Sequence, residues 1–343
     1  RSSDLGYVDK LDKLKKINGD AATIRDNIFL CYQIFGGYYT HEKYDEAFEM
    51  LAQIAAASAN EVPIIEKMLL NLETKDVSNP YLFFYLGKIY LGQNKIPQAV
   101  TQFKTGIEAN SALAQFVLPL CEPLFESMKA DAVFVRFMAM LHYYCGQFEK
   151  AFPFFELYLQ LDTSEAAFNS LKEIYEDIYI KVGGKTFVLI AMVKFLLQMN
   201  DYDGALRKFL QIRAYDNPEI ETTALLLLDK VQEKTDLHKM LAEFYVARGD
   251  VDKAVHFLGD LFGSDKGYAD FITEKLKKME VKDNKEYLKL LGDISVYRND
   301  LKDAFTFYKQ LEEAFPEEVD AIIEGYENLL AKSEKSVRLR QML

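Results

Sequence analysis

The 343-residue sequence contains no tryptophan, only eight prolines and only three cysteines. With so few prolines, long stretches of the chain can form uninterrupted helices, and half of the residues are apolar, which is enough to bury a sizeable core. Cys31, Cys121 and Cys145 lie far apart without CxxC spacing, so the sequence predicts neither a disulfide framework nor a zinc site. The composition predicts a mostly helical globular chain with ordinary buried thiols.

Positive charge is in deficit, because 41 Lys and Arg stand against 53 Asp and Glu, a net charge of −12. The acids are spread along the whole chain, so nucleic acid and anionic membrane surfaces are poor candidate partners. The longest charge-free run, residues 27–41, is shorter than the roughly 20 apolar residues of a membrane-spanning helix, and no membrane insertion is predicted.

The first residues, RSSDLG, show neither an initiator methionine nor a leader, so we expect a fragment of a longer protein or a processed form. Unpaired cysteines favour a cytoplasmic location, while a periplasmic or exported form stays open.

Motifs that carry chemistry are also absent from the sequence. The four histidines are scattered without HxxxH or HExxH spacing, and neither GxGxxG nor GxxxxGK[ST] occurs. The pair Gly183 and Gly184 has no preceding strand and is interpreted as a turn between helices. The sequence therefore predicts no catalytic residue, no cofactor and no metal site.

One pattern recurs along the chain: an alanine with an apolar residue three positions before it and a large apolar residue four positions after it. The six copies centre on Ala47, Ala99, Ala151, Ala205, Ala254 and Ala304, at separations of 52, 52, 54, 49 and 50 residues. An apolar-periodic helix precedes each alanine, as in 83–90 and 240–247, and the two are joined by short turns rich in Gly, Asn and Asp. Each copy therefore predicts an antiparallel helical hairpin.

The hairpins resemble tetratricopeptide (TPR) repeats. The copy that matches best carries Phe83, Leu86, Gly87, Tyr90, Ala99 and Phe103. The last copy carries Leu291, Gly292, Ala304, Tyr308 and Pro316. Small residues at these positions let two helices approach closely, while large ones fill the space around them. The resemblance implies an all-α fold, a right-handed α-solenoid of TPR-like hairpins.

The stride of about 51 residues exceeds the 34 of a TPR unit. The additional residues have apolar helical stripes at 62–73, 111–128, 164–180, 219–234, 267–279 and 319–332. We therefore expect a third helix in every repeat, which either pairs with a neighbour as a second hairpin or lies along one face of the solenoid. The choice between these two packings stays open at this point.

The predicted organisation is a single α-solenoid domain over residues 1–343, with an N-terminal capping helix at 1–20. The predicted repeats are 21–79, 80–130, 131–183, 184–234, 235–283 and 284–343.

The resemblance places the inner face of the solenoid on the first helix of each hairpin. Five of the six copies have a basic residue there: Lys88, Arg136, Lys194, Lys239 and Lys289. Tyr81, Phe84 and Tyr143 occupy neighbouring positions, so the hypothesis is a basic track for an acidic or extended partner segment. The alternative is that each base pairs with an acid on an adjacent helix or is covered by the third helix.

The predicted function is a non-enzymatic scaffold or adaptor that binds a partner protein or peptide, with a larger multi-protein assembly plausible. The alternative is a structural subunit of such an assembly. An α/α toroid enzyme acting on carbohydrates is the weaker alternative, since tryptophan is absent and the turns between helices are short.

Overall fold

A computed structural model describes residues 21–73, 79–215, 217–279, 281 and 284–333. All regular structure within these ranges is helical, and no β-strand occurs in them. The predicted all-α fold is therefore confirmed. The predicted capping helix at 1–20 and the C-terminal VRLRQML lie outside the described residues. No helix among the described residues is long and apolar enough to span a bilayer.

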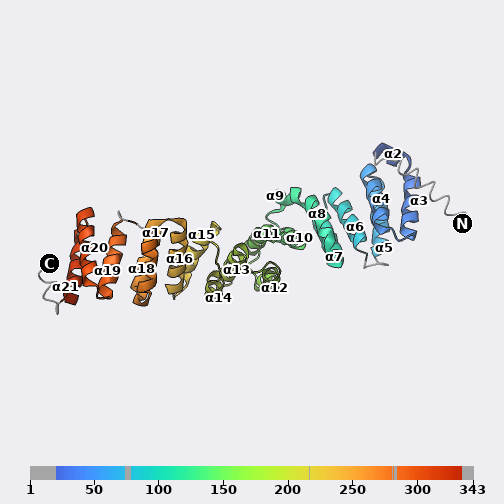
Figure 1. Ribbon diagram of the computed structural model, residues 1–343. Helices are drawn as coiled ribbons and strands as arrows, with labels where there is room; N and C mark the ends of the chain where they lie inside the picture. Colours follow the sequence, from blue (N-terminus) through green and yellow to red (C-terminus); the bar gives the residue numbers. More distant parts are fainter. Residues whose placement is uncertain (1–20, 74–78, 216, 280, 282–283, 334–343) are drawn as a thin grey trace. The chain divides into compact units, whose positions relative to one another are not determined.

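The chain forms two compact units, Arg1–Glu173 and Ile174–Leu343, and each is described by itself. Figure 1 labels the helices along the chain. The first unit contains α2 (Ala21–Asp26), α3 (Ile28–Thr40), α4 (Tyr44–Ala57), α5 (Val62–Glu73), α6 (Pro80–Gly92), α7 (Ile96–Ala109), η1 (Ser111–Leu113), α8 (Ala114–Cys121), η2 (Glu122–Leu124), α9 (Phe125–Met128), α10 (Ala132–Tyr144) and α11 (Phe148–Leu161), and α12 (Glu165–Val182) spans its boundary. The second contains α13 (Thr186–Gln198), α14 (Tyr202–Phe209), α15 (Glu219–Lys230), α16 (Thr235–Arg248), α17 (Val251–Ser264), η3 (Lys266–Tyr268), α18 (Ala269–Met279), α19 (Lys285–Tyr297), α20 (Leu301–Ala314) and α21 (Val319–Ser333). The single domain and its repeat boundaries stay a prediction.

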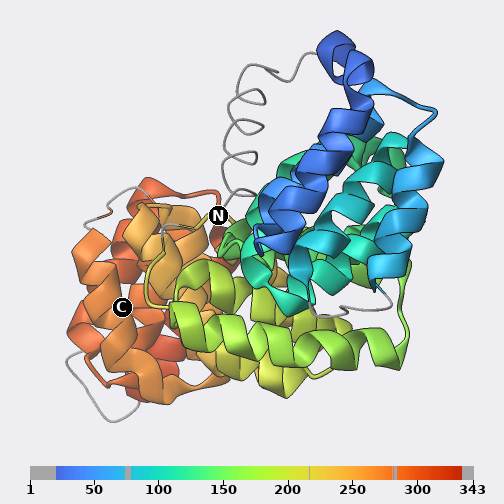
Figure 2. The same cartoon turned by 90° about the vertical axis from the view of Figure 1, so that its right-hand side faces the viewer.

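The predicted hairpins are the pairs α3/α4, α6/α7, α10/α11, α13/α14, α16/α17 and α19/α20, and the two helices of each pair pack against each other. The first pair is visible as the blue helices α3 and α4 in Figure 2. The repeated alanine is at most 1% exposed in all six pairs. A Cβ atom on Gly87 would lie 2.6 Å from the Phe103 ring, so only glycine permits this approach of α6 to α7. The steric interpretation of the repeat is confirmed.

Several first helices begin at a side-chain cap. Asn79 accepts a hydrogen bond from the backbone N–H of Tyr81, and Asp131 accepts one from Phe134. Asn284 does the same for Tyr287. These caps satisfy backbone donors that would otherwise have no partner, so they fix where each first helix starts.

Every hairpin turn contains one residue in the left-handed region. These residues lie five positions before the repeated alanine: Glu42, Asn94, Gly146, Asn200, Gly249 and Asn299, with φ between 58° and 72°. In the second hairpin, the next backbone N–H, that of Lys95, donates to the Tyr90 carbonyl at 2.9 Å, which closes the C-terminus of α6. The turn has the same geometry in all six copies, although only two of them use glycine.

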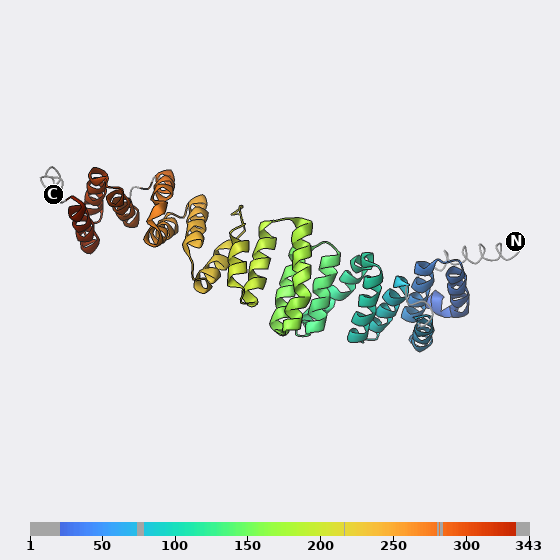
Figure 3. The same cartoon turned by 90° about the horizontal axis from the view of Figure 1, so that it is seen from below.

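The third helices occur as predicted, and they pack both within their own repeat and against the next one. In the second unit, α21 packs against both α19 and α20 of its own repeat, as Figures 1 and 3 show at the C-terminal end of the described chain. A third helix also packs against the first helix of the next repeat, as α5 does with α6 and α8 with α10. The segment 267–279 begins with η3 before α18, and the segment 111–128 is broken further, into η1, α8, η2 and α9, with Pro123 in η2.

We predict that Glu42→Gly stabilises the first repeat. Glu42 is the one turn residue of the six that is neither glycine nor asparagine, and an ordinary residue at positive φ costs about 1 kcal/mol. Urea denaturation should show a higher midpoint, which corresponds to an unfolding free energy raised by about 1 kcal/mol. Gly249→Ala, at φ 72°, is the reverse change and should lower the midpoint; a lower midpoint for Glu42→Gly would contradict the turn geometry.

Candidate binding groove

The five predicted basic residues all lie on first helices, but they fall in different units. Lys88 on α6 and Arg136 on α10 belong to the first unit. Lys194, Lys239 and Lys289, on α13, α16 and α19, belong to the second. The five residues therefore belong to two units that are described separately. The continuous basic track stays a prediction.

All four lysines have partners on neighbouring helices. Lys88 pairs with Glu49 of α4 at 3.3 Å, Lys194 with Glu219 of α15 at 2.8 Å, and Lys289 with Glu324 of α21 at 2.9 Å. The Nζ atom of Lys239 lies 5.4 and 5.2 Å from the ring centroids of Tyr268 and Phe271. In the second unit, the partners belong to the third helix of the same repeat or to the η3 turn that leads into it. Lys88, Lys194 and Lys289 thus each pair with an acid on an adjacent helix, while Lys239 lies beside aromatic rings.

Arg136 differs from Lys88, Lys194 and Lys289, which have carboxylate partners, and resembles Lys239, which lies beside aromatic rings. Within the part of the chain that the structure describes, no carboxylate lies within 4 Å of its guanidinium. The guanidinium carbon is instead 5.8 Å from the centroid of the Tyr158 ring, and its Nε is buried without a hydrogen-bond partner. The phenol of Tyr158 donates to Asp162 at 3.4 Å. Hydrogen bonds from Ser164 lower the pKa of Asp162, and the positive charge of Arg136 adds to that shift.

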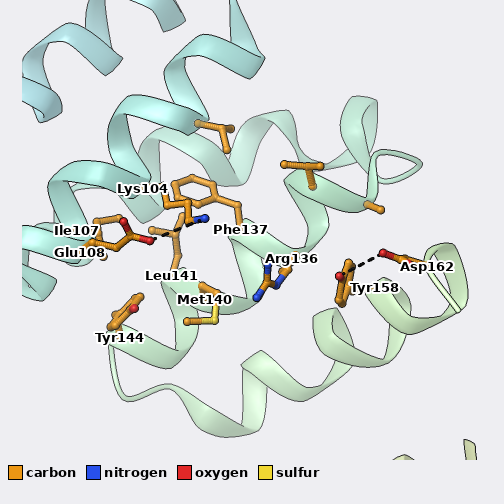
Figure 4. Close-up of a pocket in the computed structure, with 13 residues that line it drawn as sticks. Lys104, Ile107, Glu108, Arg136, Phe137, Met140, Leu141, Tyr144, Tyr158 and Asp162 are labelled. Carbon is orange, nitrogen blue, oxygen red and sulfur yellow. Dashed lines mark hydrogen bonds and ion pairs between the residues drawn. The ribbon is translucent and has the colours of Figure 1, made fainter. Parts of the chain in front are cut away.

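Arg136 lies in a groove of about 370 Å³ between α7 and α10, closed at one side by Tyr158 and Asp162. Figure 4 shows Arg136 in the middle, with Tyr158 and Asp162 on one side and Met140 and Tyr144 on the other. Apolar side chains line much of it, and two of them face solvent: Val133 is 70% exposed and Tyr144 is 38% exposed. The groove therefore combines an uncompensated cation with accessible apolar surface.

Two further charges of the groove are paired with each other. Lys104 and Glu108 lie on α7, one turn apart, with their charged atoms 3.8 Å apart and both side chains more than half exposed. A solvent-exposed ion pair of this kind contributes little to stability, and its two charges largely cancel. Among the described residues, Arg136 is the base of the groove without an ion pair, and Asp162 is the second carboxylate of the lining.

Similar grooves recur where the second helix of one hairpin meets the first helix of the next. The α4/α6 groove, about 560 Å³, is lined by Glu49 and Lys88. The α17/α19 groove, about 820 Å³, is lined by Lys289 and Glu324. Both contain the predicted base together with its carboxylate partner. The α7/α10 groove is therefore the one of these three in which the base has no ion pair within the described chain, although Asp162 also lines it.

The predicted aromatic residues lie outside the α7/α10 groove. Phe84 packs between Tyr85 and Phe103, at ring centroid distances of 5.0 and 6.1 Å. Tyr143 packs on Tyr144 and Phe148. Tyr81, on α6, is partly buried and belongs to the surroundings of the hydrophobic core of the first unit. The groove uses Tyr144 and Tyr158 instead.

Sequence reasoning missed Val133, Met140, Tyr144 and Tyr158 as groove residues. Val133 lies three residues before Arg136 and Met140 four residues after it, so helical spacing places both on the same inner face. The sequence could therefore have identified them as groove residues. Tyr158 lies on the second helix, and no register of the first helix could have identified it.

The histidines do not form a site. His142 is 3% exposed and stacks on Phe154 at 5.0 Å, and burial lowers its pKa. Burial also lowers the pKa of His238. No group of three His, Cys, Asp or Glu side chains suited to a metal ion occurs among the described residues.

The fold places the chain in the class of helical-repeat proteins, and its hairpins are TPR-like. No protein-family model matches the sequence, and no curated protein matches it. Among solved structures, the complex of Naa15 and Naa10 bound to HypK aligns at 12% identity and TM-score 0.26, covering 96% of this chain and 66% of that one. This chain thus spans just under two thirds of that relative.

Two further alignments are to proteins described as TPR proteins. The C-terminal part of a TPR repeat-containing protein from Cytophaga hutchinsonii aligns at 14% identity and TM-score 0.21, over 86% of this chain and 98% of that one. The TPR domain of P58(IPK) aligns at 14% identity and TM-score 0.18, over 92% and 82%. These likenesses concern the repeat fold alone.

We predict that Arg136→Met leaves the stability unchanged or raises it by up to about 1 kcal/mol, since it removes a buried donor without a partner and keeps the apolar stem. Lys88→Met is the matched control, which should cost a few tenths of a kcal/mol by breaking a partly exposed ion pair. Thermal unfolding of both variants makes the comparison. A loss above about 1 kcal/mol for Arg136→Met would show that Arg136 has a structural role.

We predict a pH-dependent effect of Asp293→Asn in the α17/α19 groove. Burial raises the pKa of Asp293, although Tyr308 donates to it at 2.7 Å. Because the folded pKa exceeds the unfolded value, its stabilising contribution is fully present below about pH 3.9 and is lost as the pH rises through the folded pKa. The stability of Asp293→Asn relative to the wild type should therefore increase from pH 4 to pH 7 in urea denaturation.

Tyr308→Phe is the control for this prediction, because it removes the hydrogen bond and leaves the buried carboxyl in place. Tyr308→Phe should still lose stability as the pH rises from 4 to 7, as the wild type does. A difference between Asp293→Asn and wild type that is the same at every pH would contradict the prediction.

Proposed function

We propose that the chain is a non-enzymatic protein-interaction scaffold, and that the α7/α10 groove binds an extended segment of a partner protein. The partner segment places a carboxylate at Arg136 and a large apolar side chain over Val133, Met140 and Tyr144. The observation that carries this proposal is the Arg136 guanidinium, which has no carboxylate partner among the described residues and stands beside exposed apolar side chains.

The electrostatic argument favours one acidic group over an acidic tract. A net charge of −12 repels strongly acidic segments at long range, so attraction must come from a local contact. Arg136 is partly buried, so its charge is screened less than that of a fully exposed residue. A guanidinium also binds a carboxylate through two parallel hydrogen bonds, which adds geometric selectivity.

The test compares Arg136→Glu with Lys172→Glu, an exposed base of α12 in the same unit. Partners would first be identified by affinity purification and mass spectrometry with the wild-type chain, and their affinities then measured. Arg136→Glu should weaken binding at least about tenfold, and Val133→Asp should also weaken it, while Lys172→Glu should have no effect.

Joint reversal of Arg136, Lys194 and Lys239 should weaken binding no further than Arg136→Glu alone, because neither lysine lines the α7/α10 groove. Unchanged recovery of the partner after the triple reversal would remove the groove proposal. A much larger loss for the triple variant would restore the basic track as the binding surface.

The alternative role, a structural subunit of a larger assembly, requires an apolar contact surface outside the groove. The second unit has such a surface on α21, where Val319, Ile323 and Leu330 are about half exposed.

A further inference from the structure

The last described helix, α21, has apolar residues on two faces. Its inner face is buried: Ile322 is 8% exposed and Leu329 is fully buried, where α21 packs on α19 and α20. Its outer face is not, since Val319 is 54%, Ile323 50% and Leu330 48% exposed. Large aliphatic side chains at this helical spacing form a stripe, which is more than scattered exposure.

The corresponding positions are covered in the second and fourth repeats. In the second repeat, the residues 15 and 19 positions after the repeated alanine are Ala114 and Leu118, which are 0% and 6% exposed. In the fourth repeat, the residues 15, 19 and 26 positions after it are Ile220, Ala224 and Val231, which are 1%, 0% and 7% exposed. Val319, Ile323 and Leu330 are the corresponding residues of the sixth repeat.

The covering element in both cases is an α-helix. In the first unit α10 packs against α8, and in the second unit α16 packs against α15, each helix being the first of the following hairpin. Their apolar side chains join the same clusters as the third helix beneath them, for example Met138 with Leu118 and Leu241 with Ala224. Val319, Ile323 and Leu330 of α21 therefore occupy positions that a helix of this chain covers in the second and fourth repeats.

The surface is also hollowed to accept side chains. A cavity of about 510 Å³ lies between α20 and α21, lined by Phe305, Ile323, Tyr326 and Leu330 together with the charged residues Lys309, Glu312 and Glu327. Tyr326 donates from its hydroxyl to Glu312 at 2.9 Å, which holds the ring against α20. The cavity gives an incoming apolar side chain a place to insert.

The charge around the cavity is strongly negative. Residues 301–333 contain eight acids and three lysines. Lys309 pairs with Glu313, while Lys285 and Lys289 of α19 pair with Glu318 and Glu324. A second copy of the same face would bring acids against acids, which disfavours a symmetric dimer.

We propose that the outer face of α21, with the α20–α21 cavity, docks an amphipathic α-helix of a partner protein that carries lysine or arginine on both sides of an apolar stripe. The apolar stripe covers Ile323, Tyr326 and Leu330, and the basic flanks lie against Glu312 and Glu327. This surface is independent of the α7/α10 groove, so either proposal can fail without the other.

The probe is a synthetic stapled helix of about 16 residues with a leucine stripe and lysine flanks, compared with the same peptide carrying glutamate flanks. Fluorescence anisotropy with the full chain should give at least about tenfold tighter binding for the lysine peptide, weakening with added salt. Ile323→Asp/Leu330→Asp should reduce this affinity at least about tenfold.

The matched control is Ile180→Asp/Leu225→Asp, which adds the same charge at exposed apolar positions elsewhere in the second unit and should leave the affinity unchanged. Circular dichroism melts would confirm that both double variants are folded. Equal affinity of the wild type and Ile323→Asp/Leu330→Asp, or an equal loss in the control, would overturn the proposal.

Two further outcomes would assign the face to another occupant. Residues 334–343 carry one acid, three bases and several apolar residues, so a large gain in affinity for Leu339→Asp/Met342→Asp would show that the chain's own tail competes for the face. Self-association of the free chain that Ile323→Asp/Leu330→Asp abolishes would point to a second copy. Either result would overturn docking of a partner helix.

Discussion

The close approach of two antiparallel helices at a small side chain is the constraint on which the rest of this structure depends. The repeated alanine is buried in all six hairpins, and at Gly87 even a methyl group would collide with Phe103. A left-handed residue five positions earlier sets the angle at which each second helix returns. Because both features recur at a stride of 49 to 54 residues, each first helix presents the same register to its neighbours.

The third helix of a repeat changes the surroundings of the basic side chains on the first helix. In the second unit, α15 and α21 supply carboxylates to Lys194 and Lys289, and η3 and α18 place two aromatic rings beside Lys239. Partly exposed ion pairs of this kind contribute little to stability, but they place a carboxylate beside Lys194 and Lys289. Arg136 has no such ion pair in the part of the chain that the structure describes, because α11 places the ring of Tyr158 beside it. The Tyr158 hydroxyl donates to Asp162.

Stacking of repeats also explains the surface of α21. A repeat in such an array buries its apolar faces against its neighbours, and in the second and fourth repeats the next helix covers the third helix. The two proposed sites select opposite charge: Arg136 favours one carboxylate, while the acidic rim of α20 and α21 favours a basic helix. An overall charge of −12 makes the second site the one that long-range attraction assists.

The sequence by itself determined the hairpins, their stride, the third helices and the register of Arg136, because helical periodicity and small residues at helix contacts are local properties of the chain. Only the tertiary structure decided which bases have partners, since Lys88 and Glu49 or Lys194 and Glu219 are brought together from positions 25 to 39 residues apart. It also decided that Tyr144 lines the groove while Tyr143 does not, and that α21 leaves one apolar face open. These choices depend on side-chain packing between helices, which no single-helix pattern encodes.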